Sequence, residues 1–274
     1  MARFLVVASV NADRIWTLAE KLRPGGRHAH AGISVRIGGA GWYSANALKA
    51  AGHEVALASV IGEDAIGKAI FERLNKLGID TGAVRRTAKT NTYDILADPD
   101  GERTLIFDGS QANRPLPVLP EGAIFDGAYV NAWSAISAMP CVRKGAPVLV
   151  QLPLRDRVGL YPGTHVVVSR SDTTDAPRAI WTRAQQATGG QLGGLVLTDG
   201  PSPLLVVTPK GETTVPSGPT APPGQVTIGA GDTFAGHLVA RLASGATLEA
   251  ATAEASGAAS HWLGSRPAPA TIET

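Results

Sequence analysis

The sequence predicts an α/β fold in which a doubly wound, mostly parallel sheet carries helices on both faces and is joined by a small antiparallel β lid. Short, continuous apolar runs alternate with helical segments along most of the chain, and such runs are typical of strands buried on both faces of a parallel sheet. Two stretches, at about residues 14–37 and 88–109, interrupt this alternation with paired segments of mixed polarity. We therefore expect one domain over residues 1–274, with the two insertions forming the lid.

The composition excludes several classes of protein. Of the 274 residues, 44% are hydrophobic and 18% are charged, which excludes global disorder. The 25 lysines and arginines nearly balance the 23 acidic residues, so no nucleic-acid partner is expected. The single cysteine, Cys141, excludes an internal disulfide framework. No apolar stretch reaches the roughly 18 residues of a membrane span, and the run at 4–10 lacks a signal-peptide cleavage site, so we expect a cytoplasmic protein that does not contact membranes.

The N-terminal half predicts buried strands and helices in alternation, together with both lid insertions. Asp64 stands at an N-cap position, and Gly52 and Gly78 follow two helices as C′ glycines would. Turn residues at 24–26 and 98–101 each separate two strand-like segments of the lid. The expected strands are 4–10, 14–19, 28–37, 54–61, 90–96 and 102–107, and the expected helices are 42–51 and 64–77.

The alternation resumes in the C-terminal half at about residue 124. A loop with four prolines, at 216–223, precedes the last two helices. The expected strands are 127–131, 147–152, 165–169, 194–198, 204–207 and 213–215, and the expected helices are 175–188, 232–243 and 248–263.

The glycine-rich turn before residue 232 is the strongest candidate for chemistry. Gly229 and Gly231 allow backbone N–H groups to converge at a helix N-terminus, which makes an anion site. Asp232 follows in the first helical turn, where the helix dipole would stabilise its ionised form. A carboxylate beside an anion site is placed to take a proton from a hydroxyl that attacks a bound phosphoryl group. Considered alone, this short motif is more often a plain glycine turn before a helix.

A second candidate site lies where the first strand ends. Asn11 and Asp13 stand two residues apart, so their side chains share one side of an extended segment, and such a pair suits sugar hydroxyls. The glycine-rich run at 38–41 precedes a helix and would let a ligand approach the backbone closely. The alternatives are a simple turn after the strand and a packed strand–helix connection.

Two further pairs of residues are weaker candidates for ligand contacts. Thr198 and Gly200 follow an apolar strand, where a hydroxyl and a flexible glycine could contact a nucleotide, although such a segment, considered alone, is more often a plain β-turn. Trp16 and Trp42 could stack on a substrate ring, with packing in the protein as the alternative.

Taken together, and in their order along the chain, these segments resemble the PfkB carbohydrate kinase family, which has the ribokinase-like fold. The resemblance covers nearly the whole chain. The segment at 9–13 is similar to the family's "GSxNxD", with Ala8 in place of its first glycine. Residues 38–52 are similar to the family's first glycine signature, and residues 60–67 are similar to its "VGxDxxG" segment. Residues 101–103 and Ala112-Asn113 are similar to the lid hairpin and the segment that follows it. Residues 229–232 are similar to the core of the second signature, "DTxGAGD".

The resemblance implies ATP-dependent phosphorylation of a hydroxyl on a sugar or nucleoside. Carried over by position, Asp232 would be the general base. Gly229, Ala230 and Gly231 would form the anion hole for the phosphoryl group. The acceptor would be held by Asn11, Asp13, Gly38, Gly39, Tyr43 and Asp232.

The same resemblance implies the partners of the reaction. ATP would bind with Mg²⁺, which the phosphates and water would mainly hold. The lid would exclude water and would pair with the lid of a second subunit in a homodimer. The nucleotide would contact Thr198, Gly200, Gly229, Gly231 and Ser256.

Three positions depart from the family pattern. Tyr43 replaces an asparagine that contacts substrate, and Val226 replaces an aspartate that helps to hold a monovalent cation, which argues against potassium activation. The mid-chain "N-x-x-E" is absent, and residues 169–172 occupy its place, so Asp172 is the candidate metal contact.

These departures keep two alternatives open. The first is a sugar- or nucleoside-binding homologue with impaired catalysis, although retention of Asp232 beside the anion site argues against it. The second is a kinase for a phosphorylated sugar, which would need a cluster of cations in the lid. Arg14, Arg36 and Arg103 are the candidates for that cluster.

Overall fold

The computed structural model describes residues 1–109, 117–132, 136, 139–151, 163–220, 227–265 and 271–272. The strands in this part of the chain are β1 (Arg3–Ala8), β2 (Asn11–Leu18), β3 (His30–Gly38), β4 (Glu54–Gly62), β5 (Val84–Thr87), β6 (Thr92–Ala97), β7 (Arg103–Ile106), β8 (Gly127–Asn131), β9 (Val148–Gln151), β10 (His165–Ser169), β11 (Gly194–Thr198), β12 (Leu204–Thr208) and β13 (Gly211–Val215). The helices are α1 (Ala40–Ala50), α2 (Ala65–Lys76), α3 (Pro177–Ala187), α4 (Ala230–Ala243) and α5 (Leu248–Gly264), with a short 3-10 helix, η2 (Arg170–Asp172). Within the described residues, no helix combines the length and apolar character that a membrane crossing needs.

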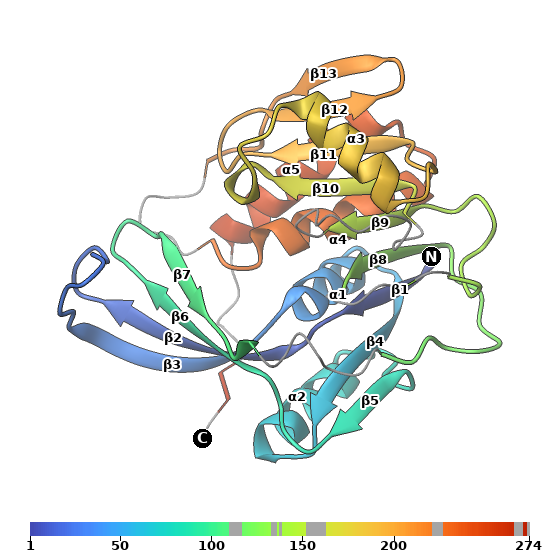
Figure 1. The fold of residues 1–274 in the computed structure, drawn as a ribbon. Coiled ribbons are helices and arrows are strands. Elements are labelled where there is room, and N and C mark those ends of the chain that lie inside the picture. Colours follow the sequence, from blue (N-terminus) through green and yellow to red (C-terminus); the bar gives the residue numbers. More distant parts are fainter. Residues whose placement is uncertain are drawn as a thin grey trace.

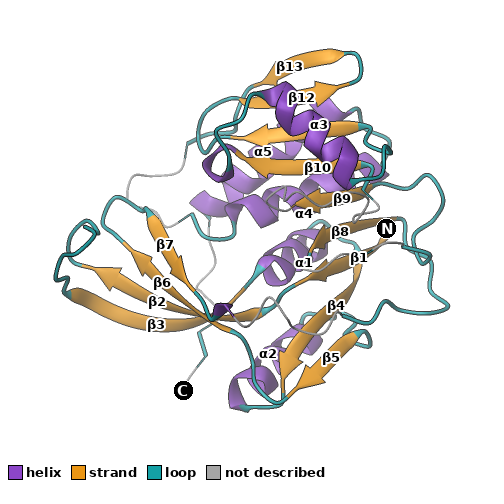
Figure 2. Ribbon diagram, viewed as in Figure 1, coloured by secondary structure: helices purple, strands orange, loops and turns teal. Residues whose placement is uncertain are grey.

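The larger of two sheets has the order β13-β12-β11-β10-β9-β8-β1-β4-β5 in the described part of the chain (Figures 1 and 2). Every neighbouring pair from β11 to β5 is parallel, and β12 and β13 add an antiparallel edge. The prediction of a mostly parallel sheet is therefore confirmed. The edge strand β5 was not predicted, because its four residues include Arg85 and Arg86 and give no apolar run.

Alternate side chains of the buried strands pack into two separate apolar cores, one on each face of the sheet. On β1, Phe4 and Val6 face the core that α1, α2, α4 and α5 cover, whereas Leu5 and Val7 face the core that contains α3. All four side chains are fully buried, and each large apolar side chain buried in this way contributes about 1.5–3 kcal/mol. Helices therefore cover both faces of the sheet, as the apolar runs predicted.

The smaller sheet has the order β3-β2-β6-β7 and lies beside the larger sheet, beyond the ends of β1 and β4 (Figure 1). Each insertion forms the predicted antiparallel pair, β2 with β3 and β6 with β7. The two pairs are joined by a parallel β2–β6 pairing, which the sequence did not reveal because it links distant segments. Strand β2 begins at Asn11, earlier than predicted, so that Asn11 and Asp13 lie within a strand rather than in a turn.

Asp64 ties the end of β4 to the start of the β6–β7 hairpin. Its carboxylate caps α2 by accepting from the N–H of Gly67 at 2.8 Å. It also accepts from the N–H of Thr90 at 2.9 Å and from the Thr90 hydroxyl at 2.5 Å. A Cβ at Gly62 or at Gly67 would collide with Thr90, so the glycines of this run keep the hairpin close to the larger sheet.

Candidate active site

The turn that opens α4 has the backbone shape that the predicted anion site needs, although the N–H of Ala230 already donates to the carbonyl of Thr227 at 3.0 Å. Gly229 has φ of +85°, a left-handed conformation that favours glycine. A Cβ there would lie 2.5 Å from the ring of Tyr43, so space as well as conformation requires glycine. The N–H groups of Gly231 and Asp232 belong to the first turn of α4, where no earlier carbonyl of the helix can accept from them, and they are available to an anion.

Asp232 is a partly exposed side chain in the first turn of α4. Burial among protein atoms raises the pKa of its carboxyl to about 6, against the hydrogen bond from Tyr129 and the positive charge of Arg103, which both act to lower it. We expected the helix dipole to favour the ionised form, and the net shift runs the other way because burial outweighs that effect. A carboxyl group with this pKa is ionised at neutral pH and is a stronger base than an ordinary aspartate, as a general base requires.

A polar cluster at the ends of β8 and β9 surrounds Asp232. The hydroxyl oxygen of Tyr129 lies 2.9 Å from Oδ1 of Asp232 and 3.1 Å from Oε1 of Gln151. Nδ2 of Asn131 donates to the same hydroxyl at 3.3 Å. None of these three residues was predicted as part of the site, although Tyr129 and Asn131 stand two residues apart in an otherwise apolar strand, a pattern that places both on one side of it.

Arg103, the first residue of β7, brings a positive charge to the turn that opens α4. Its Nη1 donates to Oγ1 of Thr227 at 3.3 Å, two residues before Gly229. The other two arginines of the smaller sheet differ from it. Arg14 is engaged by both carboxylate oxygens of Asp94, at 2.5 and 2.7 Å, and Arg36 lies opposite Asp13 in the β2–β3 register.

The second predicted site is assembled at the start of β2 and the end of β3. Asn11 and Asp13 are 2% and 3% exposed, and Nδ2 of Asn11 donates to Oδ1 of Asp13 at 2.5 Å. A Cβ at Gly38 would collide with the carboxylate of Asp13, and one at Gly39 would collide with Oδ1 of Asn11. The structure thus brings together the four residues that the two separate motifs contributed.

Asn91 is a further polar residue at this site that the sequence analysis did not find. It is 7% exposed, and its backbone carbonyl accepts from the N–H of Ala12, which places it beside Asn11 in the parallel β2–β6 pairing. Its side-chain oxygen has no hydrogen-bond partner among the described residues. A buried acceptor without a donor is unfavourable, so this oxygen has the capacity for a further hydrogen bond.

Comparison of the amino-acid sequence with models of protein families identifies the family of this chain. A family model described as "pfkB family carbohydrate kinase" matches residues 1–141 and 173–273. The chain belongs to the pfkB family. No curated protein matches the chain closely enough to count as a relative.

Solved structures share the pfkB-family fold along nearly the whole chain. The ribokinase of Cryptococcus neoformans, in complex with ADP, has a TM-score of 0.73 at 22% identity, with 98% of this chain and 96% of that chain covered. The ribokinase of Thermotoga maritima has a TM-score of 0.70 at 18% identity, covering 96% and 93%. The nucleoside kinase of Burkholderia thailandensis, in complex with inosine, has a TM-score of 0.71 at 16% identity, covering 95% and 90%. The fold of this pfkB-family chain is therefore that of sugar and nucleoside kinases.

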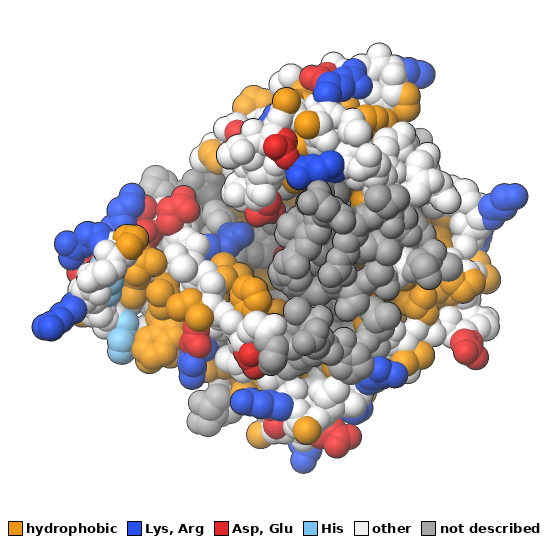
Figure 3. All heavy atoms as spheres, in the orientation of Figure 1, with side chains coloured by type: hydrophobic (Ala, Val, Ile, Leu, Met, Phe, Trp, Pro, Cys, Tyr) orange, Lys and Arg blue, Asp and Glu red, His pale blue; other side chains and the backbone are white. Residues whose placement is uncertain are grey.

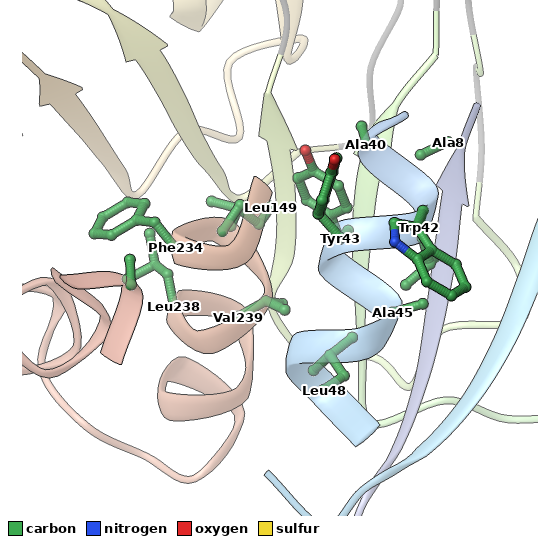
Figure 4. Packing of buried hydrophobic residues seen from close by; sticks show 14 of the residues in the cluster. Ala8, Ala40, Trp42, Tyr43, Ala45, Leu48, Leu149, Phe234, Leu238 and Val239 are labelled. Carbon is green, nitrogen blue, oxygen red and sulfur yellow. The ribbon is translucent and has the colours of Figure 1, made fainter. Parts of the chain in front are cut away.

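Tyr43, the first departure from the family pattern, is 8% exposed and packs between two elements of the site. Its ring lies against Gly229 and makes an edge contact with Trp262, with 5.8 Å between ring centroids. Its hydroxyl is directed toward the Ala40 end of α1 (Figure 4). Trp42 is also 8% exposed and packs in the core on another side of α1, which favours the packing alternative over stacking on a substrate (Figure 4).

The residues predicted to contact nucleotide come from β11, the start of α4 and the middle of α5. Thr198 ends β11, and Gly200 follows it with φ of +53°. Ser256 is buried in α5, and its Oγ accepts from the N–H of Gly218 at 2.8 Å, so in this structure it holds the loop after β13. The contacts of these residues with a nucleotide stay predictions.

The magnesium ion stays a prediction. No group of three or more His, Cys, Asp or Glu side chains among them could bind a metal ion by itself. An ion held mainly by phosphates and water needs no such group. Asp172 is exposed in η2, directly after β10, and its contact with the metal stays a prediction. Val226 and Ala112-Asn113 lie outside the described residues.

Proposed function

We propose that the protein is an ATP-dependent kinase that phosphorylates a hydroxyl group of a sugar or a nucleoside. The observation that carries this proposal is the position of Asp232: a carboxyl group with a pKa of about 6 in the first turn of the helix whose N-terminus forms the anion site. This arrangement couples a base for the attacking hydroxyl with donors for the transferring phosphoryl group.

The reaction follows from these two parts. Asp232 takes the proton of the acceptor hydroxyl as its oxygen attacks the γ-phosphorus, and the bond from that phosphorus to the bridging oxygen breaks, which releases ADP. The N–H groups of Gly231 and Asp232, in the first turn of α4, stabilise the charge on the phosphoryl oxygens, and Arg103 adds a positive charge nearby. A bound Mg²⁺ would neutralise phosphate charge, with Asp172 as its predicted protein contact.

The acceptor site suits a compound with several hydroxyl groups. Asn11, Asp13 and Asn91 present buried acceptor oxygens at one end of β2, and the oxygen of Asn91 lacks a partner among the described residues. Hydroxyl groups can donate to all three. The similar structures from C. neoformans and B. thailandensis hold ADP and inosine, which supports ATP as the phosphoryl donor and a ribose-containing acceptor.

We propose the smaller sheet as a lid over this site, because Arg103 reaches the anion site from β7. Its apolar residues Ile33, Leu105 and Ile106, and Phe107 just after β7, are 46–53% exposed, and Figure 3 displays apolar side chains over this sheet. Pairing of two lids in a homodimer is consistent with this exposure and stays a prediction. Its measurement is the molar mass in solution.

The decisive experiment is ATP consumption by the purified protein with a panel of pentoses, hexoses, sugar phosphates and nucleosides, in the presence of magnesium and with or without potassium. We expect turnover with one class of acceptor, without a requirement for potassium. Absence of turnover, together with a thermal shift caused by one of the same compounds, would instead indicate the binding homologue with impaired catalysis.

A further inference from the structure

We propose that Tyr129 is a positioning residue whose hydroxyl proton follows the charge of Asp232. It donates to the ionised carboxylate before the reaction and turns to Gln151 when Asp232 receives the proton of the acceptor. The inference rests on the proposed function, because it assigns a step to the base of that reaction. It extends the function by naming the group that adapts to the proton transfer.

The geometry gives the Tyr129 hydroxyl two alternative acceptors. Tyr129 is fully buried, and its oxygen lies 2.9 Å from Oδ1 of Asp232 and 3.1 Å from Oε1 of Gln151. A phenol carries one proton and can donate to only one of them at a time. Asn131 donates to the same oxygen at 3.3 Å, so this contact uses the hydroxyl as an acceptor and leaves its proton for Asp232 or Gln151.

The charge of Asp232 decides between the two acceptors. A hydrogen bond to an ionised carboxylate is about twice as strong as one to a neutral acceptor, so the proton points to Asp232 while it is charged. Once Asp232 holds the acceptor's proton, its oxygen loses this advantage, and the amide oxygen of Gln151 becomes a comparable acceptor. No covalent bond of Tyr129 breaks: the phenol keeps its proton, and only the O–H direction changes.

The surroundings keep Tyr129 a donor throughout. Burial, followed by the adjacent charge of Asp232, holds the pKa of its phenol well above its usual range, so it does not compete as a base. In the described part of the chain, the ionisable groups that influence Asp232 are Tyr129 from β8 and Arg103 from β7, in addition to the N-terminus of α4 itself. Arg103 also favours the ionised carboxylate, but it is exposed and its effect is weakened by salt, whereas the contact with Tyr129 is buried.

The test is Tyr129→Phe, which removes the hydroxyl and keeps the ring. The titration of Asp232 is followed by ¹³C NMR in protein labelled at the aspartate carboxyl groups, with Asp232→Asn assigning the signal. We expect the midpoint of Asp232 to rise by about one pH unit, because a hydrogen bond to a charged group is lost. An unchanged midpoint overturns the proposal. Tyr93→Phe, which removes a phenol from the smaller sheet, is the matched control and should leave the midpoint in place.

The kinetic readout separates this role from a structural one. With the active acceptor, kcat/KM of Tyr129→Phe should fall about tenfold below pH 6 and approach the wild-type value at pH 9. A loss that is equal at every pH indicates a structural role and overturns the proposal. Gln151→Met, which removes the second acceptor, should lower kcat and leave the Asp232 midpoint unchanged, and an unchanged kcat overturns the switch.

The two readouts also distinguish this inference from the proposed function. The NMR titration needs no turnover, so a shifted midpoint in an enzyme that phosphorylates nothing would retain the Tyr129–Asp232 contact and reject the kinase. Should Tyr129→Phe fail to fold, 3-fluorotyrosine at position 129 provides the opposite test. A more acidic phenol is a stronger donor and should lower the midpoint of Asp232.

Discussion

The two ends of the candidate site are built in different ways. At the phosphoryl end, Asp232 and Tyr129 belong to a helix and a strand of the larger sheet, and burial of one charge sets their chemistry. At the acceptor end, Asn11 and Asp13 lie in the smaller sheet, and the nearby glycines decide how closely the backbone approaches them. We infer that the first end determines the rate of the chemical step, whereas the second determines which hydroxyl compound is held.

The largest expected effect tests the phosphoryl end. Asp232→Asn keeps the size of the side chain and removes the base, so turnover should fall by ~10²–10⁴ while ATP binding stays largely intact. The measurements are steady-state kinetics with the active acceptor and calorimetric titration with ATP. A variant that keeps more than about a tenth of wild-type turnover would show that Asp232 is not the base.

Residues of the phosphoryl end that are close together in the sequence could be predicted, whereas those far apart could not. The 229–232 turn is contiguous, so its glycines and its carboxylate could be predicted from the sequence as one motif. Tyr129 is 103 residues away from Asp232, and only the adjacent placement of β8 and α4 brings them together. The direction of the Asp232 pKa shift was predicted wrongly for the same reason, because burial depends on elements that the motif does not contain.

At the acceptor end, most of the individual residues could be predicted but their contacts could not. Asn11 and Asp13 were predicted from their spacing, and Gly38 and Gly39 from a separate motif, but their mutual contact required the β2–β3 register. Asn91 could not be predicted, because the parallel β2–β6 pairing that places it beside Asn11 joins two insertions about 80 residues apart. The helices and buried strands were predicted well, since their apolar periodicity is a local property.

A substitution in β3 tests the acceptor end directly. Gly38→Ala would push its Cβ into the carboxylate of Asp13, and overpacking of this kind costs about 1–3 kcal/mol. We expect kcat/KM for the acceptor to fall roughly tenfold or more, mainly through KM, with KM for ATP unchanged.

Gly32→Ala is the matched control, because this glycine lies in the same strand and a Cβ added to it would have no heavy atom within 4 Å. Its kinetics should equal those of the wild type. An equal rise of both KM values in Gly38→Ala would remove the distinction between the two ends.

The unpartnered oxygen of Asn91 allows a sharper test of the same end. Asn91→Leu removes a buried acceptor that lacks a donor among the described residues, so it should stabilise the free protein by about 1 kcal/mol. The same change should raise KM for the acceptor by about three- to tenfold, since one hydrogen bond to the ligand is lost. Denaturant unfolding and acceptor kinetics measure the two effects.

Thr252→Val provides the control for this trade between stability and binding. Thr252 is fully buried in α5, and its hydroxyl also lacks a partner among the described residues. Its replacement should stabilise the protein to a similar extent without affecting KM. If Asn91→Leu is stabilised with an unaltered KM, Asn91 does not contact the acceptor.

The smallest expected effect concerns the link that holds the acceptor end to the larger sheet. Burial acts to raise the pKa of Asp64, but hydrogen bonds from Thr90 and Gly67 outweigh it and hold the pKa below its ordinary value. A carboxyl group whose pKa is lowered by folding contributes stability above its unfolded pKa, and that contribution is lost as the pH falls through the folded pKa. Asp64→Ala should therefore lower the free energy of unfolding by about 1 kcal/mol at pH 7, and the difference from wild type should shrink below about pH 4.

Denaturant unfolding from pH 7 to below about pH 4 measures this difference in stability, and a difference that is constant with pH would mean that the ionised carboxylate does not secure the hairpin. Because Asp64 touches neither Asp232 nor the anion turn, kcat should be retained, and a fall in kcat would show that the two ends of the site are not independent.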